Sequence, residues 1–324
     1  MTTWITGLDE AGYGPLLGPL VVGLSTLRSE EPLTPRAPWK LLAPTVCKRR
    51  GARGVAVADS KSLHKPSTGD LSPLEEGVLA FVTAERGGET PSSFRELLSH
   101  LTEGRIGYLD DYPWYAGRDL ELPASVHSLA LKGAATRVAR VLERRSLAIT
   151  EVRAIPLDVL EFNQGVLDHG SKHEVNAGAM GRFLQWLWRM DRPENAVFTD
   201  RLGGKERYGP FLQPLFPEGK LRIVEQAKQR QAYEIRCDAP DRRLTVHFEM
   251  GGEDRCFNTA LASMTAKYVR ELHMRLFNSW WQEHSPVELN PTAGYYQDAK
   301  RFLEETRKLR AELRVEDRLL IRQR

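Results

Sequence analysis

Hydrophobic residues near the start of the chain fall into two short runs, which predict β-strands at residues 4–8 and 20–27. The residues between the runs are rich in glycine and proline, as in a tight connection. Two acids, Asp9 and Glu10, follow the first run directly. Neighbouring residues of an extended chain point to opposite faces, but the glycines after them allow the backbone to bend and another segment to approach. The pattern is typical of a metal site or a phosphate-contacting loop, and equally of a surface turn with two solvated carboxylates.

The rest of the chain alternates between helical and extended patterns. Helices are predicted at residues 74–86, 92–101, 125–145, 173–190, 259–281 and 298–312. Strands are predicted at residues 151–160, 196–199, 221–226, 232–237 and 244–250. Residues 28–54 are rich in proline, serine and arginine and predict a long surface excursion. The aromatic run at residues 108–115 predicts a packed corner of the fold, with stacking on bases as the alternative.

A further acid stands where a buried-looking strand ends. Asp200 follows residues 196–199, and two glycines come shortly after it. Functional groups of α/β sheets gather where strands end, so Asp200 is a candidate site residue. The alternative is that it caps a helix that starts at Glu206. The Asp-Ser-Lys sequence at residues 59–61 follows another short apolar run, and by itself it predicts the N-cap of a helix.

Histidine and cysteine form no clear metal-binding pattern. His169 and His173 are four residues apart, as two metal ligands on a helix can be, but no further ligand is near them in the sequence. The three cysteines, Cys47, Cys237 and Cys256, lack metal-ligand spacing and cannot all pair. A reducing, cytoplasmic environment is the simplest interpretation of this cysteine usage.

Composition narrows the class of protein without deciding its function. The chain has 324 residues, enough for one large domain or two ordinary ones. Its content of 41% hydrophobic and 27% charged residues is typical of a soluble globular protein. No apolar run approaches the length of a membrane span, and the N-terminus lacks the pattern of a secretory signal. The net charge of +3 neither requires nor excludes nucleic acid as a partner.

Residues 6–23 closely resemble the N-terminal motif of the type 2 ribonucleases H, the ribonuclease HII and HIII family. That motif reads G-[IVS]-D-E-[AV]-G-x-G-x-x-x-G-P, and the residues that match it are Asp9, Glu10, Gly12, Gly14, Gly18 and Pro19. The resemblance implies an α/β fold of the ribonuclease H kind, in which helices flank a mixed sheet. We expect a catalytic domain over residues 1–285, with insertions near residues 28–54, 64–120 and 205–240. Residues 286–324 are then a C-terminal helical segment that contacts substrate.

Three more elements resemble the same family. The sequence at residues 59–61 is similar to its D-S-K-x-L element, which makes Lys61 a candidate for contact with a substrate phosphate. Asp200 takes the place of the aspartate in its D-G-N element, although Arg-Leu-Gly-Gly follows the acid here. Tyr295, which follows Gly294 and precedes a charged helix, takes the place of a tyrosine that packs on the substrate sugar.

The segment at residues 251–267 resembles the family's G-D-x-x-x-x-x-x-A-A-S-I-x-A-K segment. Counting back from Lys267 selects Glu253 for the acidic position, with Asp254 as the second choice. Small residues early in the following helix also have a purely structural interpretation, since they let a helix pack tightly on a sheet.

The substrate loop of the family reads G-R-G, and this chain has Gly12, Tyr13 and Gly14 in its place. By resemblance these three residues contact the substrate. Because the arginine is absent, cleavage at a single ribonucleotide within DNA is in doubt. The hypothesis that follows is cleavage of longer RNA:DNA hybrids.

Four carboxylates, those of Asp9, Glu10, Asp200 and Glu253, are therefore the catalytic and metal-binding candidates. Converging carboxylates raise one another's pKa values unless a cation is present, and Mg²⁺ or Mn²⁺ prefers such oxygen ligands. The resemblance implies two ions per site and hydrolysis of the RNA strand of RNA:DNA hybrids, leaving a 5′-phosphate and a 3′-hydroxyl. We expect a monomer. The alternatives are a nuclease of this fold for another structured nucleic acid, and a nucleic-acid-binding module that has lost catalysis.

Overall fold

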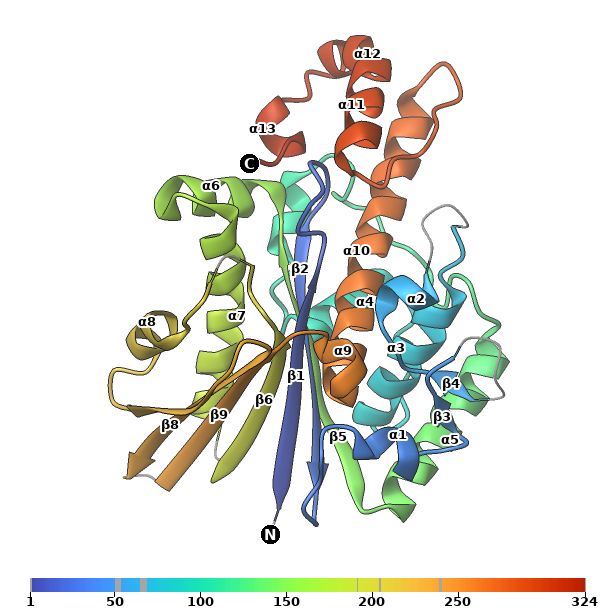
Figure 1. Ribbon diagram of the computed structural model, residues 1–324. Helices are drawn as coiled ribbons and strands as arrows, with labels where there is room; N and C mark the ends of the chain where they lie inside the picture. Colours follow the sequence, from blue (N-terminus) through green and yellow to red (C-terminus); the bar gives the residue numbers. More distant parts are fainter. Residues whose placement is uncertain are drawn as a thin grey trace.

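A seven-stranded mixed sheet forms the centre of the protein (Figure 1). The computed structural model describes residues 2–49, 54–64, 69–190, 192–203, 205–238 and 241–323. The strand order is β5-β2-β1-β6-β9-β8-β7. The strands are β1 (Thr3–Ala11), β2 (Leu20–Ser29), β5 (Leu147–Leu157), β6 (Glu194–Asp200), β7 (Lys220–Gln226), β8 (Arg230–Asp238) and β9 (Asp241–Glu249). Three neighbours in the middle, β1, β6 and β9, run parallel, while the β1–β2, β2–β5, β8–β9 and β7–β8 pairs are antiparallel.

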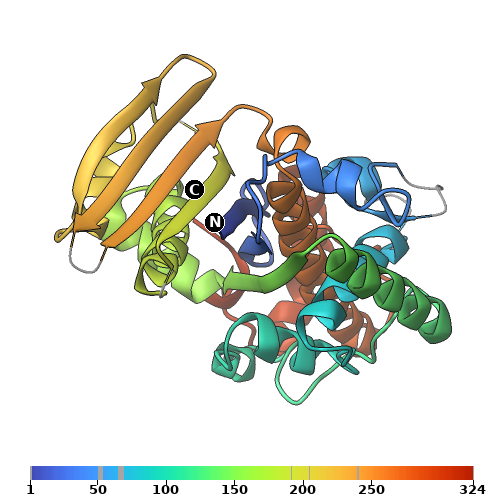
Figure 2. The same ribbon diagram turned by 90° about the horizontal axis from the view of Figure 1, so that it is seen from below.

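Helices cover both faces of this sheet. The long helix α10 (Phe257–His284) contacts β1, β2 and α3 (Ser72–Glu85), and α3 packs in turn on α5 (Ser128–Arg144). Helices α6 (Val159–His169) and α7 (Lys172–Arg189) lie on the other side of the sheet. Side chains alternate along a strand, so the neighbouring β2 residues Val21 and Val22 belong to the two different cores. Figure 2 shows β7, β8 and β9 reaching away from α10, at the end of the sheet opposite to β5. The predicted mixed sheet flanked by helices is thus confirmed.

Helix α10 approaches the sheet closely enough to exclude side chains from two strand positions. A β-carbon added to Gly7 would lie 2.0 Å from the backbone nitrogen of Thr259, and one added to Gly23 would lie 2.2 Å from the carbonyl oxygen of Ala262. Glycine on the strands and small residues early in α10 therefore make this contact possible. The close packing also brings the first turns of α10 beside the last residues of β1.

Several element boundaries differ from the predicted ones. The strand expected at residues 151–160 begins earlier and ends at Leu157, because the side chain of Asp158 accepts hydrogen bonds from the backbone nitrogens of Leu160 and Glu161 and so caps α6. Sequence analysis missed this helix. The helix expected at residues 298–312 is two helices, α11 (Tyr296–Glu305) and α12 (Arg307–Glu312). The strands expected at residues 221–226 and 232–237 form the β7–β8 hairpin.

The segments expected to be insertions carry regular structure. Their elements are α1 (Ala37–Leu41), β3 (Val46–Cys47), α4 (Phe94–Leu101), η2 (Gly107–Asp111), α8 (Gly209–Leu212) and η3 (Gln213–Leu215), beside α3, β7 and β8. The elements β4 (Val55–Ala56) and α2 (Ser60–Leu63) lie between the first two segments. Parts of these segments, residues 50–53, 65–68 and 239–240, lie outside the described residues. The aromatic run is packed as predicted, with Tyr112, Trp114 and Tyr115 all buried. None of the helices described is long and apolar enough to cross a membrane.

Candidate active site

The acids of β1 and β6 meet at one edge of the sheet because their strands are parallel neighbours. The register pairs Leu8 with Thr199, which places Asp9 level with Asp200. Both Asp9 and Glu10 lie within β1 and not after it, since the strand continues to Ala11. Asp200 is the last residue of β6. The expected cap of a helix at Glu206 is not formed, because α8 begins only at Gly209.

Glu253 reaches the same place from the end of β9, the next parallel strand. Gly251, with φ of +67°, turns the chain out of the strand into the short helix α9 (Gly252–Arg255). The Glu253 carboxylate accepts a hydrogen bond of 2.6 Å from Ser263 Oγ and shares another with Asp9. Asp254, in contrast, is exposed, and its backbone carbonyl accepts a hydrogen bond from Lys48. Of the two acids, Glu253 is the one that joins the group on β1.

Burial and mutual repulsion hold these carboxyl groups in an unusual state. Burial raises the pKa of Asp9 well above its ordinary value, and the charges of Glu10 and Glu253 raise it further. Burial also raises the pKa of Glu10, against a hydrogen bond from Asn176 that lowers it, and nearby Asp200 adds to the rise. The pKa of Glu253 is raised by burial as well. A nearby cation would relieve this repulsion.

Lys61 supplies a positive charge beside the acids. It lies in α2, where the carboxylate of Asp59 accepts a 2.9 Å hydrogen bond from the Lys61 backbone nitrogen, so the predicted N-cap is confirmed. Ser60 Oγ lies 3.0 Å from Ser263 Oγ and ties this helix to α10. Partial burial alone would lower the pKa of Lys61, but the surrounding carboxylates, Glu253 first among them, raise it.

Asn176 is a member of this group that sequence analysis missed. It lies on α7, is buried, and its side chain forms a hydrogen bond with Glu10. Its Oδ1 atom has no partner among the described residues. A signal was present in the sequence: Asn176 stands four residues before Met180, on the apolar side of the predicted helix, and a buried amide requires a polar partner.

The loop after β1 carries Gly12, Tyr13 and Gly14. Gly12 has φ of +86°, and the Tyr13 hydroxyl lies 2.9 Å from His173 Nδ1 on α7. His173 is therefore engaged with the loop, while His169 is exposed at the end of α6. Within the described ranges, no three or more histidine, cysteine, aspartate or glutamate side chains are arranged as a ready-made metal cage. The acids gather, but their oxygens do not yet converge on one point.

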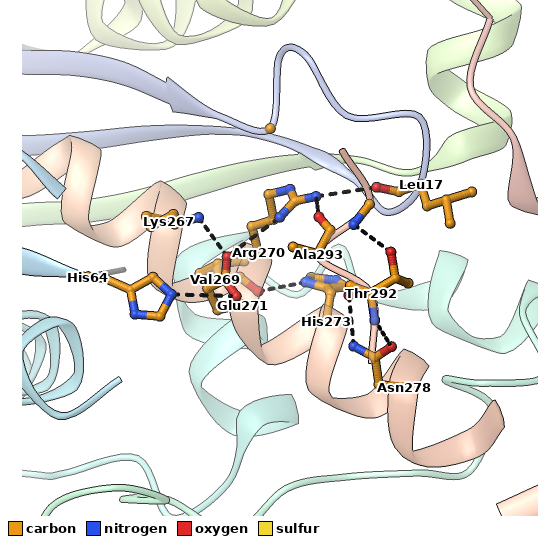
Figure 3. Close-up of polar contacts among 12 residues, drawn as sticks. Leu17, His64, Lys267, Val269, Arg270, Glu271, His273, Asn278, Thr292 and Ala293 are labelled. Carbon is orange, nitrogen blue, oxygen red and sulfur yellow. Dashed lines mark hydrogen bonds and ion pairs between the residues drawn. The ribbon is translucent and has the colours of Figure 1, made fainter. Parts of the chain in front are cut away.

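Arg270 lies beneath this loop (Figure 3), and Tyr295 lies beside the arginine. Arg270 is fully buried on α10, and its Nη2 donates to the carbonyl oxygens of Leu17, at 3.3 Å, and Ala293, at 2.8 Å. The Arg270 guanidinium lies 5.8 Å from the ring centre of Tyr295, which is 45% exposed at the start of α11. The loop after β1 and the tyrosine predicted to contact sugar thus share one buried arginine, which sequence analysis did not single out.

Lys267, a motif residue of α10, points to a different partner. Its Nζ donates to Glu271 Oε1 at 2.7 Å, and His64 Nε2 lies 3.8 Å from the other oxygen of the same carboxylate (Figure 3). The lysine therefore stabilises a buried carboxylate one helical turn farther along α10.

Comparisons with known proteins find likeness in structure and not in sequence. No family model matches the chain, and no curated protein matches it. The chain is similar to the solved ribonuclease H2 of Pyrococcus horikoshii OT3, with 14% identity and a TM-score of 0.46, over 98% of this chain and 92% of that one. It is also similar to the RNase HII of Archaeoglobus fulgidus solved with PCNA, with 11% identity and a TM-score of 0.40, over 99% of this chain and 94% of that one. It is similar as well to the RNase H3 of Aquifex aeolicus, with 11% identity and a TM-score of 0.37, over 98% of this chain and 70% of that one.

Proposed function

We propose that this protein is a divalent-metal-dependent endoribonuclease that hydrolyses the RNA strand of RNA:DNA hybrids. The observation that carries the proposal is the meeting of Asp9, Glu10, Asp200 and Glu253 at the carboxyl ends of three adjacent parallel strands. These acids stand in the order that the sequence resemblance requires. Burial raises the pKa values of Asp9, Glu10 and Glu253, and this is costly for the fold unless these carboxylates serve a cation.

The donor set suits Mg²⁺ or Mn²⁺, because hard cations prefer carboxylate oxygens. Asp9, Glu10, Asp200 and Glu253 would hold the ions. When bound, two such ions supply an activated water and stabilise the leaving oxygen of a phosphodiester, which gives a 5′-phosphate and a 3′-hydroxyl. The four acids need not supply every ligand, since Mg²⁺ commonly completes its coordination with water and substrate phosphates.

The protein's own groups orient these acids. Ser263 donates to Glu253, which fixes that carboxylate against α10. Asn176 bonds Glu10 and favours its ionised form, since the bond lowers the Glu10 pKa. Lys61 lies close enough to the acids for electrostatic interaction with them. We assign to its ammonium group the contact with a substrate phosphate.

The substrate side is formed by the loop of Gly12, Tyr13 and Gly14 and by Tyr295. Recognition of RNA requires contact with the 2′-hydroxyl, and a glycine-rich loop lets the backbone approach that group. Tyr295 presents an exposed ring beside the same loop, suitable for packing on a sugar. Because Tyr13 cannot grip a phosphate as an arginine would, we propose longer hybrids as the preferred substrate. The segment at residues 286–324, which carries Tyr295, is then a substrate-contact segment.

Cleavage assays with paired acid variants test the proposal. A uniform RNA:DNA hybrid and a duplex with one ribonucleotide are incubated with Mg²⁺ and with Mn²⁺. We expect Asp9→Asn, Asp200→Asn and Glu253→Gln to lose at least about 100-fold in hybrid cleavage, and the exposed neighbour Asp254→Asn to retain it.

Three outcomes would decide against parts of the proposal. Equal losses in Glu253→Gln and Asp254→Asn would remove the assignment of Glu253. Strong cutting of the single-ribonucleotide duplex would show that Tyr13 does not restrict the enzyme to longer hybrids. Tight hybrid binding with no cleavage and no Mn²⁺ binding in a calorimetric titration would identify a binding module and refute the proposed activity.

A further inference from the structure

The end of the chain folds back onto the loop after β1. Helix α13 (Asp317–Leu320) is followed by a short tail in which the backbone nitrogen of Arg322 donates to the Leu16 carbonyl at 2.9 Å. On its other side the tail is held by Asn163, whose Nδ2 donates to the Ile321 carbonyl at 2.9 Å and whose Oδ1 accepts from the Gln323 nitrogen at 2.7 Å. The tail is thus fixed between α6 and the loop.

The side chain of Arg322 lies against the backbone of that loop. It is 2% exposed, and its guanidinium donates to the carbonyl oxygens of Gly12 and Tyr13. The guanidinium also lies 3.9 Å from the ring centre of Phe162. Its Nε atom has no hydrogen-bond partner among the described residues. A buried guanidinium nitrogen without a partner is costly, so the loop carbonyls satisfy the Arg322 guanidinium only in part.

A cavity of about 150 Å³ opens beside this guanidinium, and we call it the Lys172–Arg322 pocket. Its lining residues are Tyr13, Gly14, Pro15, Leu16, Lys172, Arg322 and Gln323. Lys172 Nζ lies 4.9 Å from the ring centre of Tyr13. In the part of the chain that the structure describes, neither Lys172 nor Arg322 forms an ion pair with a carboxylate. A pocket with two cations and no acid in its lining is suited to an anion.

Arg322 keeps its charge at neutral pH although it is buried. Burial lowers its pKa to about 9, and the neighbouring Arg270 contributes to the decrease. Two buried guanidiniums close to each other repel, so an anion in the pocket would stabilise both. The pocket is therefore positive under the conditions in which nucleic acid would bind.

We propose that the Lys172–Arg322 pocket binds a phosphodiester group of the nucleic-acid backbone that passes the Gly12–Tyr13–Gly14 loop. This inference rests on the proposed function, because it needs a nucleic acid bound at the acids of β1. The loop that lines the pocket continues directly from Asp9 and Glu10, so a duplex engaged by the acids extends past it. Lys172 contacts the phosphate, while the guanidinium of Arg322 holds the loop and adds its positive charge to the pocket.

Lys172 provides the sharper test, since changing Arg322 would also release the loop. The variants are Lys172→Gln, Lys172→Arg, which retains the charge, and the control Lys132→Gln on the exposed side of α5. Each carries Asp200→Asn so that bound hybrid is not cut. Binding of a labelled RNA:DNA hybrid is measured by fluorescence anisotropy over a series of KCl concentrations.

We expect Lys172→Gln to reduce the slope of log K against log[KCl] by about 0.7 to 0.9, the effect of losing one phosphate contact. Lys172→Arg and Lys132→Gln should keep the slope of the parent. An unchanged slope for Lys172→Gln, with normal hybrid binding, would overturn the pocket and leave the proposed function intact. Failure of the Asp200→Asn parent to bind hybrid, together with failure of the unsubstituted protein to cleave it, would refute the proposed function itself.

Inorganic phosphate at constant ionic strength separates a backbone phosphodiester from a free anion. If the pocket serves the backbone, phosphate should weaken hybrid binding by the parent more than by Lys172→Gln. Binding of phosphate in calorimetry with no effect on the hybrid would assign the pocket to a free anion and overturn the proposal.

Discussion

The hydroxyl of Tyr13 lies 2.9 Å from Nδ1 of His173, and this contact joins the loop after β1 to the first turn of α7. The two rings are 5.6 Å apart between centres, tilted by 45°. His173 also borders the chain after β6, because a β-carbon added to Gly203 would lie 3.4 Å from its Cε1. One imidazole therefore lies between the two loops that follow the acidic strands. It is placed to hold the loop after β1 in position relative to Asp200.

The Tyr13–His173 contact predicts that Tyr13→Phe and His173→Gln have similar and non-additive effects. Each variant removes the same partly buried hydrogen bond, worth about 1 kcal/mol, or about a five-fold change in kcat/KM for a hybrid. The double variant should lose little more than either single one in a double-mutant cycle. The exposed His169→Gln serves as the control. Fully additive losses would show that the two residues act separately.

Gly12 and Gly14 provide a matched pair for the loop backbone. Gly12 has φ of +86°, and a β-carbon there would lie 2.6 Å from Arg270 Nε and 2.7 Å from the Pro19 carbonyl oxygen. Around Gly14 no heavy atom of the described residues, beyond Gly14 and its two chain neighbours, lies within 4 Å of such a β-carbon. We expect Gly12→Ala to lower the free energy of unfolding by about 1 to 3 kcal/mol and to impair cleavage, and Gly14→Ala to change stability by less than about 0.5 kcal/mol.

Urea unfolding followed by circular dichroism measures both variants. Equal stabilities for Gly12→Ala and Gly14→Ala would contradict the close packing of the loop against Arg270.

Asn176 predicts a change in the pH dependence of cleavage. Its hydrogen bond lowers the pKa of Glu10, against the effect of burial, so Asn176→Leu should raise that pKa further. If cleavage needs ionised Glu10, the acid limb of the kcat/KM profile moves to higher pH, with about a ten-fold loss below its midpoint for each pH unit of displacement. The control is Gln185→Leu on the same helix, whose amide binds the Leu215 carbonyl instead. A uniform loss at every pH would indicate a packing effect only.

The buried His273 predicts that the protein loses stability at low pH, independently of the carboxylates of the candidate site. Burial lowers its pKa from 6.5 to about 4. The assigned tautomer donates from Nδ1 to the Val269 carbonyl and accepts at Nε2 from the Tyr108 hydroxyl. The unfolded chain binds the proton more readily than the folded one, so the contribution is fully present above pH 6.5 and is lost as the pH falls toward 4. A pKa change of this size corresponds to about 3 kcal/mol.

Unfolding free energies measured between pH 7 and pH 4 check this prediction. His273→Gln should be less stable than the parent at pH 7 but should show a smaller decrease toward pH 4. His169→Gln, which changes an exposed histidine, should keep the decrease of the parent. Identical pH dependence in all three proteins would exclude His273 as the responsible group.

The sequence alone determined the features that depend on neighbouring residues. Alternation and apolar spacing placed most strands and helices, because side-chain direction repeats every two residues in a strand and about every 3.6 in a helix. The N-cap at Asp59 followed from the preference of a short acid for the free backbone nitrogens of a helix start. The paired acids Asp9 and Glu10 and the acid Asp200 were recognisable from their place beside apolar runs and glycines.

Only the tertiary structure decided which distant groups share the site. Which of the two neighbouring acids, Glu253 or Asp254, joins the site depends on how Gly251 turns the chain beside α10. The sequence does not distinguish between them. The bond between Arg322 and the Gly12 carbonyl joins residues 310 positions apart, and Arg322 has no local pattern that distinguishes it from other basic residues near the end of the chain. The physical reason is that sequence patterns report direction relative to one element, whereas a site depends on the register and packing of several.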